Sequence, residues 1–220
     1  MPSVARMPQH ERRARTRSAL LGAAGRVFAE RGYHGATLED VVAEAGVSKG
    51  ALYHYFSSKQ ELFLALLEEH LAEGMDDAEA LIAEPGPERG QIGLAAEGFL
   101  RRVGHDPRWL PLLLEFLAYG SRDEQARAGV VEHFTRPARD RVAVMLHRLP
   151  PETLDGAAAS IEELSVGIAA LANGLAIERA FDPEAVAEDL FGRLLGVLIA
   201  GLEAQSAAIA TQRTSSAESR

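Results

Sequence analysis

Residues 37–59 read TLEDVVAEAGVSKGALYHYFSSK, and this stretch decides the fold of the N-terminal part of the chain. Thr37 and Ser48 are residue types that favour helix N-caps, and Gly46 can adopt the positive φ that ends a helix. Apolar residues recur three and four positions apart on both sides of Gly46. The segment therefore predicts two short helices joined by a glycine turn. Such a pair places its second helix in the major groove of DNA.

The second predicted helix, residues 49–56, carries polar and aromatic side chains on the faces that are not expected to pack. Leu52 and Phe56 lie four positions apart, so both should face inward. The small residues let the backbone approach base edges, and the remaining positions supply donors and flat surfaces for phosphates and bases. These positions are Lys49, Gly50, Ala51, Tyr53, His54 and Tyr55.

The stretch GATLEDVVAEAGVSKGALYHYFSSKQELF resembles the DNA-binding domain of the TetR family of transcriptional regulators, and the resemblance extends over about residues 16–67. It implies phosphate contacts from Thr37, Ser48, Tyr53, Tyr55 and Lys59. It also implies base-edge contacts from Lys49, Gly50, Ala51 and His54. Structural alternatives remain open: Tyr55 as a core aromatic, Lys49 and Lys59 as solvated lysines, and His54 as a surface residue without a role.

Charge is distributed unevenly along the 220 residues, whose net charge is −9. Residues 1–60 hold nine Lys and Arg against five Asp and Glu, a net charge of +4, and residues 61–220 hold fourteen against twenty-seven, a net charge of −13. The positive part coincides with the predicted DNA-binding segment, as phosphate binding requires. A basic arm at the N-terminus contributes to it through Arg6, Arg12, Arg13, Arg15 and Arg17.

Apolar spacing and helix breakers predict an all-α protein, because no strand pattern is found along the chain. Breaks fall at EPGPERG, HDP, LPP and FDP, and Pro137 should kink one helix. The expected helices cover 11–31, 38–45, 49–56, 59–82, 91–103, 123–148, 152–180 and 184–208. The expected domains are a disordered basic arm at 1–10, a three-helix DNA-binding domain with a helix-turn-helix at 11–58, a larger helical effector-binding and dimerisation domain at 59–208, and a disordered tail at 209–220.

The last two expected helices are apolar around more than half of their circumference, which indicates burial on several sides. Paired with a second copy they would form a four-helix bundle, and the family resemblance implies the same homodimer. A core within one chain is the alternative. The expected interface residues are Ile168, Leu171, Leu175, Leu194, Leu195, Leu198 and Leu202.

The family resemblance also implies that the middle helices enclose a small-molecule effector. Aromatic and polar side chains at helical spacing could line such a site, although most residues of this kind belong to a core. The candidates are Phe99, His105, Trp109, Leu113, Phe116, Tyr119, His133, Phe134, Met145, Ile168 and Asn173. Asn173 could instead pair across the dimer.

Other function classes find little support in the sequence. The chain has no cysteine, and it shows no HExxH motif, P-loop, dinucleotide fingerprint or nucleophile elbow. We therefore expect no enzyme activity, no cofactor and no bound metal. No uninterrupted apolar run of 18 residues and no secretory signal occur, so we expect a cytoplasmic protein without a membrane span.

Together these patterns predict a ligand-responsive, sequence-specific DNA-binding regulator of transcription. The expected partners are double-stranded DNA, a second copy of the chain and an unknown small-molecule effector. We expect a repressor that its effector releases from a pseudo-palindromic operator. An activator, or a DNA-binding protein of the same fold that needs no ligand, is the alternative.

Overall fold

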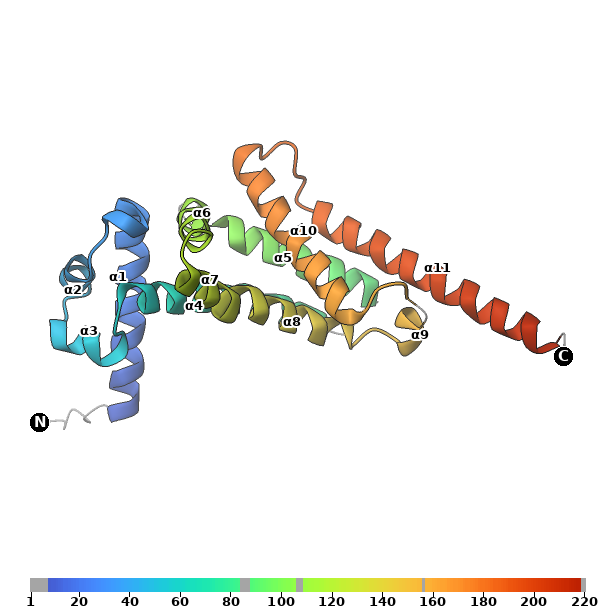
Figure 1. Ribbon diagram of the computed structural model, residues 1–220, viewed down its shortest axis with the longest axis horizontal. Helices are drawn as coiled ribbons and strands as arrows, with labels where there is room; N and C mark the ends of the chain where they lie inside the picture. Colours follow the sequence, from blue (N-terminus) through green and yellow to red (C-terminus); the bar gives the residue numbers. More distant parts are fainter. Residues whose placement is uncertain (1–7, 84–87, 106–108, 156, 219–220) are drawn as a thin grey trace, which may run out of the picture. The chain divides into compact units, whose positions relative to one another are not determined.

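The computed structural model describes residues 8–83, 88–105, 109–155 and 157–218, and every regular element within them is helical. This confirms the predicted all-α class. The described residues form two compact units (Figure 1). The first unit combines the chain up to His70 with residues 111–134, and the second combines residues 71–110 with the chain from Thr135 onwards.

Three helices open the first unit: α1 (Gln9–Gly35), α2 (Leu38–Ala45) and α3 (Lys49–Tyr55). Local sequence explains their boundaries. Asp40 and Thr37 form a reciprocal capping box at the start of α2, and Gly46 ends that helix with φ 64°. Ser48 then caps α3 by accepting the N–H of Ala51 at 3.2 Å. The predicted helix–turn–helix is confirmed at the level of these elements.

A backbone break lies near the end of α1. Gly32 has φ 70° and ψ 168°, a conformation almost confined to glycine. The break separates the long part of α1 from a last short turn that ends at Gly35. The sequence pattern places the helix end at residue 31, and the structure shows the chain resuming one helical turn beyond Gly32.

An aromatic core joins α1 to α4 (Lys59–Ala83) and α6 (Trp109–Gly120) within the first unit. Phe28, Tyr33, Phe63 and Phe116 are all nearly inaccessible. Their rings meet mostly edge to face, with centroids 5.3 Å apart for Phe28 and Phe63 and 4.9 Å apart for Tyr33 and Phe116. Such pairs stabilise a core beyond the apolar area that they bury.

The remaining helix of the first unit, α7 (Glu124–Val130), passes into a π-helical turn, η1 (Val131–Thr135), and then into α8 (Arg136–Leu146). In an α-helix the ring of Pro137 would meet the carbonyl four residues earlier. The wider π turn precedes this proline, which sits in the first turn of α8, where its missing N–H costs no hydrogen bond. In place of the kink predicted at Pro137, the structure shows a change from π-helix to α-helix just before this proline.

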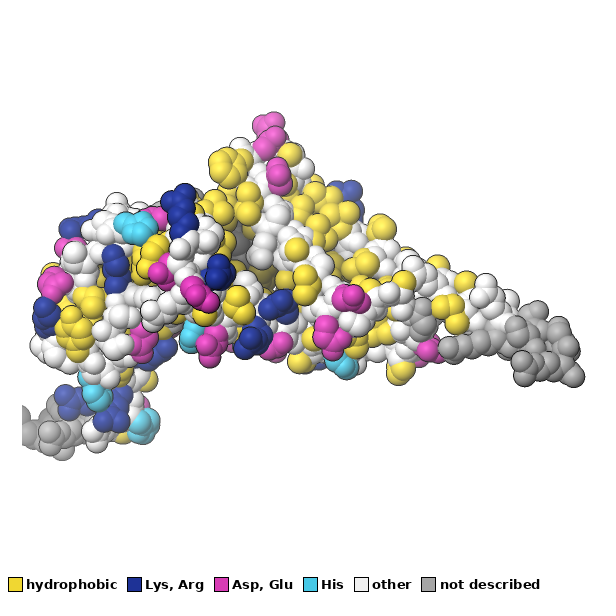
Figure 2. Space-filling model, in the orientation of Figure 1, with side chains coloured by type: hydrophobic (Ala, Val, Ile, Leu, Met, Phe, Trp, Pro, Cys, Tyr) yellow, Lys and Arg dark blue, Asp and Glu magenta, His cyan; other side chains and the backbone are white. Residues whose placement is uncertain are grey.

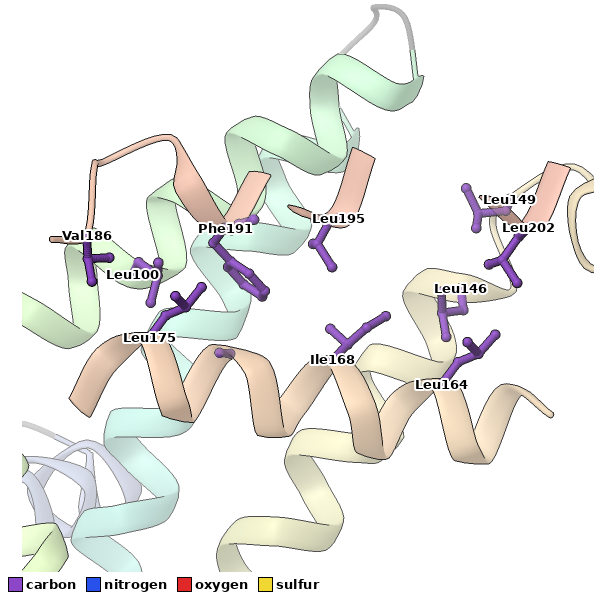
Figure 3. Close-up of a cluster of buried hydrophobic side chains, with 12 residues drawn as sticks. Leu100, Leu146, Leu149, Leu164, Ile168, Leu175, Val186, Phe191, Leu195 and Leu202 are labelled. Atoms are coloured by element: carbon purple, nitrogen blue, oxygen red, sulfur yellow. The ribbon is translucent and has the colours of Figure 1, made fainter. Parts of the chain in front are cut away.

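The second unit is built from α5 (Glu88–His105), α8, α9 (Pro151–Leu154), α10 (Ile161–Phe181) and α11 (Leu190–Glu218), with the last part of α4. Figure 3 shows its apolar core, where side chains from four helices point toward one another. The labelled members are Leu100, Leu146, Leu149, Leu164, Ile168, Leu175, Val186, Phe191, Leu195 and Leu202.

Gly192 lets α11 cross close to Gly93 of α5 inside this unit. A Cβ added to Gly192 would lie 2.9 Å from the carbonyl oxygen of Gly93 and 3.0 Å from its Cα. Backbone atoms cannot move aside as a flexible side chain can. The close approach therefore requires glycine at this point of α11.

Several predicted boundaries need correction. The expected helix 152–180 is two elements, α9 and α10, because Ser160 and Glu163 form a capping box that starts a new helix. The expected helix 184–208 begins only at Leu190 and continues to Glu218, so α11 runs through most of the segment predicted to be a disordered tail. At the N-terminus, α1 already includes Gln9 and His10 and carries Arg12, Arg13, Arg15 and Arg17 of the predicted basic arm. Residues 1–7, including Arg6, lie outside the described residues.

Residues Ile161–Phe181 and Leu190–Ile209 have the length and mean hydropathy of a membrane-spanning helix. The buried side of each lies in the core of the second unit. Core helices of water-soluble proteins commonly reach the same apolarity, so this observation carries little weight against the predicted absence of a span.

Candidate nucleic-acid interface

The outer face of α3 carries four solvent-exposed residues, Lys49, Gly50, Tyr53 and His54. Tyr53 is 48% exposed. No atom lies within 4 Å of the Cβ position of Gly50, so the backbone there is open to close approach. Ala51 and Tyr55 are half-buried beside this face. The structure thus brings Lys49, Gly50 and His54, three of the four predicted base-edge residues, together on one open surface, and Ala51 lies half-buried beside it.

The opposite face of α3 anchors it to the rest of the first unit. Leu52 and Phe56 are buried, as their spacing predicts. The guanidinium of Arg17 in α1 lies 5.8 Å from the centroid of the Phe56 ring, a cation–π distance that sequence reasoning missed. Because this packing fixes the inner side, the outer side of the recognition helix α3 is presented in one orientation.

Thr37, a predicted phosphate contact, is occupied by its role as a cap. Its hydroxyl donates to Oδ2 of Asp40 at 2.7 Å, and its backbone N–H donates to the same oxygen at 3.0 Å. These two bonds lower the pKa of the Asp40 carboxyl. A phosphate would have to replace Asp40 as the acceptor, so the contact implied by the family resemblance requires exchange of these hydrogen bonds.

Lys59 is placed differently from its expected role as a phosphate contact. Its Nζ donates to the carbonyl oxygens of Tyr33 at 2.7 Å, Ala36 at 3.0 Å and His34 at 3.3 Å. It also lies 4.7 Å from the centroid of the Tyr33 ring. Burial lowers the pKa of its ammonium, and the nearby Glu115 carboxylate opposes that shift. Lys59 therefore satisfies carbonyls at the end of α1, which is where cations stabilise a helix.

Glu115 completes this arrangement from α6, and sequence reasoning did not single it out. Its two carboxylate oxygens accept the backbone N–H of Tyr33 at 3.0 Å and of His34 at 3.1 Å. It is the sole charged residue in the apolar run 109–120, which is the pattern that could have revealed it. A half-buried carboxylate among apolar residues is costly unless it accepts hydrogen bonds. Glu115 accepts them from backbone amides that directly follow Gly32.

The predicted dimer residues divide between core and surface. Leu194 is 37% exposed. Ile168, Leu175, Leu195 and Leu202 lie in the core cluster of the second unit, while Leu171 and Leu198 pack against it. The exposed side of α10 and α11 instead carries small and apolar residues that were not predicted. They are Val166, Gly167, Ala170, Gly174, Phe181, Val197, Ala200, Gly201 and Ala204.

The predicted effector residues also fall in different places. Phe116 and Tyr119 pack against Tyr33 in the first unit, Phe116 edge to face and Tyr119 tilted, with the Tyr119 and Tyr33 ring centroids 5.6 Å apart. In the same unit, Nδ1 of His133 lies at hydrogen-bond distance, 2.5 Å, from Oε1 of Glu68. Leu113, Phe134, Trp109 and Ile168 are buried, Phe99 and Met145 are half-buried, and Asn173 is exposed on α10. The side chain of His105 lies outside the described part of the chain. The role of these residues in ligand binding stays a prediction.

A capped α2, a left-handed glycine turn and an exposed α3 above a buried anchor define a helix-turn-helix DNA-binding protein. The sequence model of bacterial regulatory proteins of the tetR family matches residues 20–66. The chain is 34% identical over 163 residues to the transcriptional regulator BetI of Agrobacterium fabrum, covering 73% of this chain and 75% of that protein. The chain therefore belongs to the TetR family of bacterial regulatory proteins.

Two further relatives have opposite signs of regulation. The transcriptional activator FasR of Mycolicibacterium smegmatis is 37% identical over 110 residues, which are 50% of this chain and about half, 48%, of that protein. The transcriptional repressor AcnR of Corynebacterium diphtheriae is 35% identical over 132 residues, 60% of this chain and 64% of that protein.

Solved structures share the fold at low sequence identity. The fatty acid degradation regulator FadR of Bacillus halodurans has a TM-score of 0.65 at 17% identity, covering 84% of this chain and 94% of that one. A Saccharomonospora viridis protein in complex with choline has a TM-score of 0.61 at 20% identity, covering 84% and 96%. At these identities the likeness concerns the fold alone.

Proposed function

We propose that this protein is a homodimeric repressor that binds a pseudo-palindromic operator and leaves it when a small molecule binds the second unit. The observation that carries the DNA-binding part is the open face of α3, where Lys49, Tyr53 and His54 surround an uncovered Gly50. The positive charge of residues 1–60 supports the same role. The bacterial cytoplasm is the compartment in which such a protein meets its operator.

A dimer is supported by the exposed side of α10 and α11. Phe181 is 77% exposed and Val197 71% exposed, and the Cβ positions of Gly167, Gly174 and Gly201 have no atom within 4 Å. Figure 2 shows hydrophobic side chains over the surface where Figure 1 places these helices. TetR-family regulators act as dimers. Two recognition helices roughly 34–36 Å apart would read two half-sites one helical turn apart.

Release by a ligand is supported by the fold and by what two structures of the same fold bind or regulate. One structural neighbour holds choline, and another is a regulator of fatty acid degradation. A ligand that moves the DNA-bound population from 99% to 1% must favour the released conformation by about 5.5 kcal/mol. Weaker differential binding would give partial release.

Activation, or DNA binding without any ligand, is the second candidate. FasR is an activator and AcnR a repressor, so relatives support either sign. The position of the operator distinguishes the two, because a repressor site overlaps the promoter while an activator site lies upstream of it. Transcription in vitro from the selected promoter should fall when the protein is added, and a rise would favour activation.

Selection of bound duplexes from random DNA tests the proposal most directly. We expect an enriched sequence with two inverted half-sites whose centres are about one helical turn apart. Enrichment of a single half-site would contradict the dimer, and no enrichment at low salt would contradict sequence-specific binding. Choline and a long-chain fatty acid can then be added to the bound complex. Loss of binding with either probe would support ligand release.

A further inference from the structure

Helix α2 carries three acidic residues beside the recognition helix, and their partners differ. Asp40 pairs with Arg31 of α1 at 2.7 Å, and Glu44 pairs with Arg26 of α1 at 2.7 Å. These two pairs hold α2 against α1. Glu39 reaches the other way, to Lys49 at the start of α3. Among these three carboxylates, Glu39 is the one that touches a residue of the DNA-facing surface.

The Glu39–Lys49 pair spans the turn between the two helices in full view of solvent. Nζ of Lys49 lies 2.5 Å from Oε1 of Glu39, and the two side chains are 58% and 61% exposed. The same ammonium lies 5.9 Å from the centroid of the Tyr53 ring. The hydrogen bond lowers the pKa of Glu39 and raises that of Lys49, so both groups are charged at neutral pH.

A free lysine at this position would bind any duplex, because its ammonium on a flexible four-carbon chain can reach whichever phosphate is nearest. Phosphate contacts carry no sequence information, whereas a lysine that meets O6 and N7 of guanine does. Glu39 accepts one of the three N–H groups of Lys49 and leaves two for a base edge. Its own negative charge opposes close approach of a phosphate.

We propose that Glu39 is a specificity-determining positioning residue, which holds the ammonium of Lys49 toward guanine in the operator and away from the phosphate backbone. This inference rests on the proposed function, since it requires α3 to read DNA. In this arrangement Glu39 lowers affinity for all DNA and lowers it most for DNA of the wrong sequence.

The substitution Glu39→Gln tests the proposal by fluorescence anisotropy with two probes, the duplex selected from random DNA and a scrambled duplex of equal length. Binding to the scrambled duplex should tighten roughly three- to tenfold, since one exposed charge contact is removed. Binding to the selected duplex should change less, so the ratio of the two affinities falls. The salt dependence for the scrambled duplex should steepen by up to about one unit.

Glu44→Gln is the matched control, because it removes the same charge from the same helix but breaks the pair with Arg26 instead. We expect it to leave the affinity ratio close to that of the wild type. The substitution Lys49→Met should cancel the effect of Glu39→Gln when the two are combined. A new selection with the Glu39→Gln variant should yield a weaker preference for guanine at one position in each half-site.

The outcomes separate two failures. If the wild-type protein enriches no sequence, the proposed function and this inference both fall. If the wild type enriches an operator but Glu39→Gln and Glu44→Gln change the affinity ratio alike, only the inference is overturned. Equal tightening on both duplexes, or an unchanged effect of Glu39→Gln in the absence of Lys49, also overturns it. Glu39→Ala must repeat the result of Glu39→Gln.

Discussion

Lys59 shows how a residue in a family motif can stabilise the fold. Its ammonium donates to three carbonyl oxygens at the end of α1, and it stands over the ring of Tyr33. Glu115 accepts the amides of the same segment. The short turn after Gly32 is therefore held by a cation from α4 and an anion from α6, and neither partner is near it in sequence.

Replacement of Lys59 by Met should destabilise the protein while leaving the salt dependence of DNA binding unchanged. Loss of charge-assisted bonds to partly buried carbonyls is expected to cost about 1–3 kcal/mol, which thermal unfolding followed by circular dichroism would detect. If Lys59 instead contacted a phosphate, the slope of log K against log salt would flatten by about 0.9. Lys49→Met, at an exposed position, should unfold at the wild-type temperature.

Tyr33 should ionise far later than an ordinary tyrosine. Burial raises its pKa from 10.0 to about 12, helped by the nearby Tyr119 and Asp123. A group whose pKa is raised in the folded state contributes stability that is complete below pH 10 and is lost as the pH rises through about 12. Absorbance at the tyrosinate band should show a late step, and Tyr33→Phe should remove it.

At the scale of the helices, sequence patterns predicted the helix ends that are set by residues close together in the chain. Thr37, Gly46 and Ser48 each act within four residues, so the ends of α2 and the start of α3 could be predicted from the chain alone. The contacts of Lys59 with Tyr33 and of Glu115 with the same turn bridge 26 and 82 residues. No local pattern encodes such distances, which explains why both were missed.

The faces of α10 and α11 could not be predicted for a different reason. Both helices carry apolar or small residues around most of their circumference, so periodicity does not tell an intrachain core from an interface. Of the seven residues predicted for the interface, six lie in the core or pack against it and Leu194 is exposed. The exposed side carries mainly glycine, alanine and valine, with Phe181 at the end of α10.

The crossing of α5 and α11 should depend on glycine. Gly192→Ala would press a methyl group against the backbone of Gly93, and relief of this overlap should cost about 1–3 kcal/mol through separation of the two helices. Thermal unfolding measures the loss. Gly22→Ala is the control, since its Cβ would meet the nearest side-chain atom at 3.7 Å. That variant should be as stable as the wild type or slightly more stable.

At the scale of the whole molecule, the proposed dimer would associate through the exposed side of α10 and α11. Val197→Glu should yield a folded monomer, because a charge buried without a partner opposes association while the core of the second unit stays intact. Sedimentation velocity would report the change in mass. Binding to the selected duplex should fall sharply, since a monomer reads one half-site.

Val144→Glu provides the comparison for this experiment. Val144 on α8 is 53% exposed and lies outside the proposed interface. The variant should sediment as the wild type does and keep its affinity for DNA. Dissociation of both variants alike would show that any added charge weakens assembly, and it would remove α10 and α11 as the specific interface.

The uncovered side of α10 has a genetic consequence. In the proposed dimer, a copy whose α3 is damaged keeps Val166, Gly174 and Phe181, so it would still pair with an intact copy. Each mixed dimer has one intact α3 and cannot bind both half-sites of an inverted repeat. Equal synthesis of the two forms would leave about a quarter of all pairs fully active, as random pairing requires. Lesions in α3 should therefore be dominant over the wild-type allele, whereas lesions that unfold α10 should be recessive.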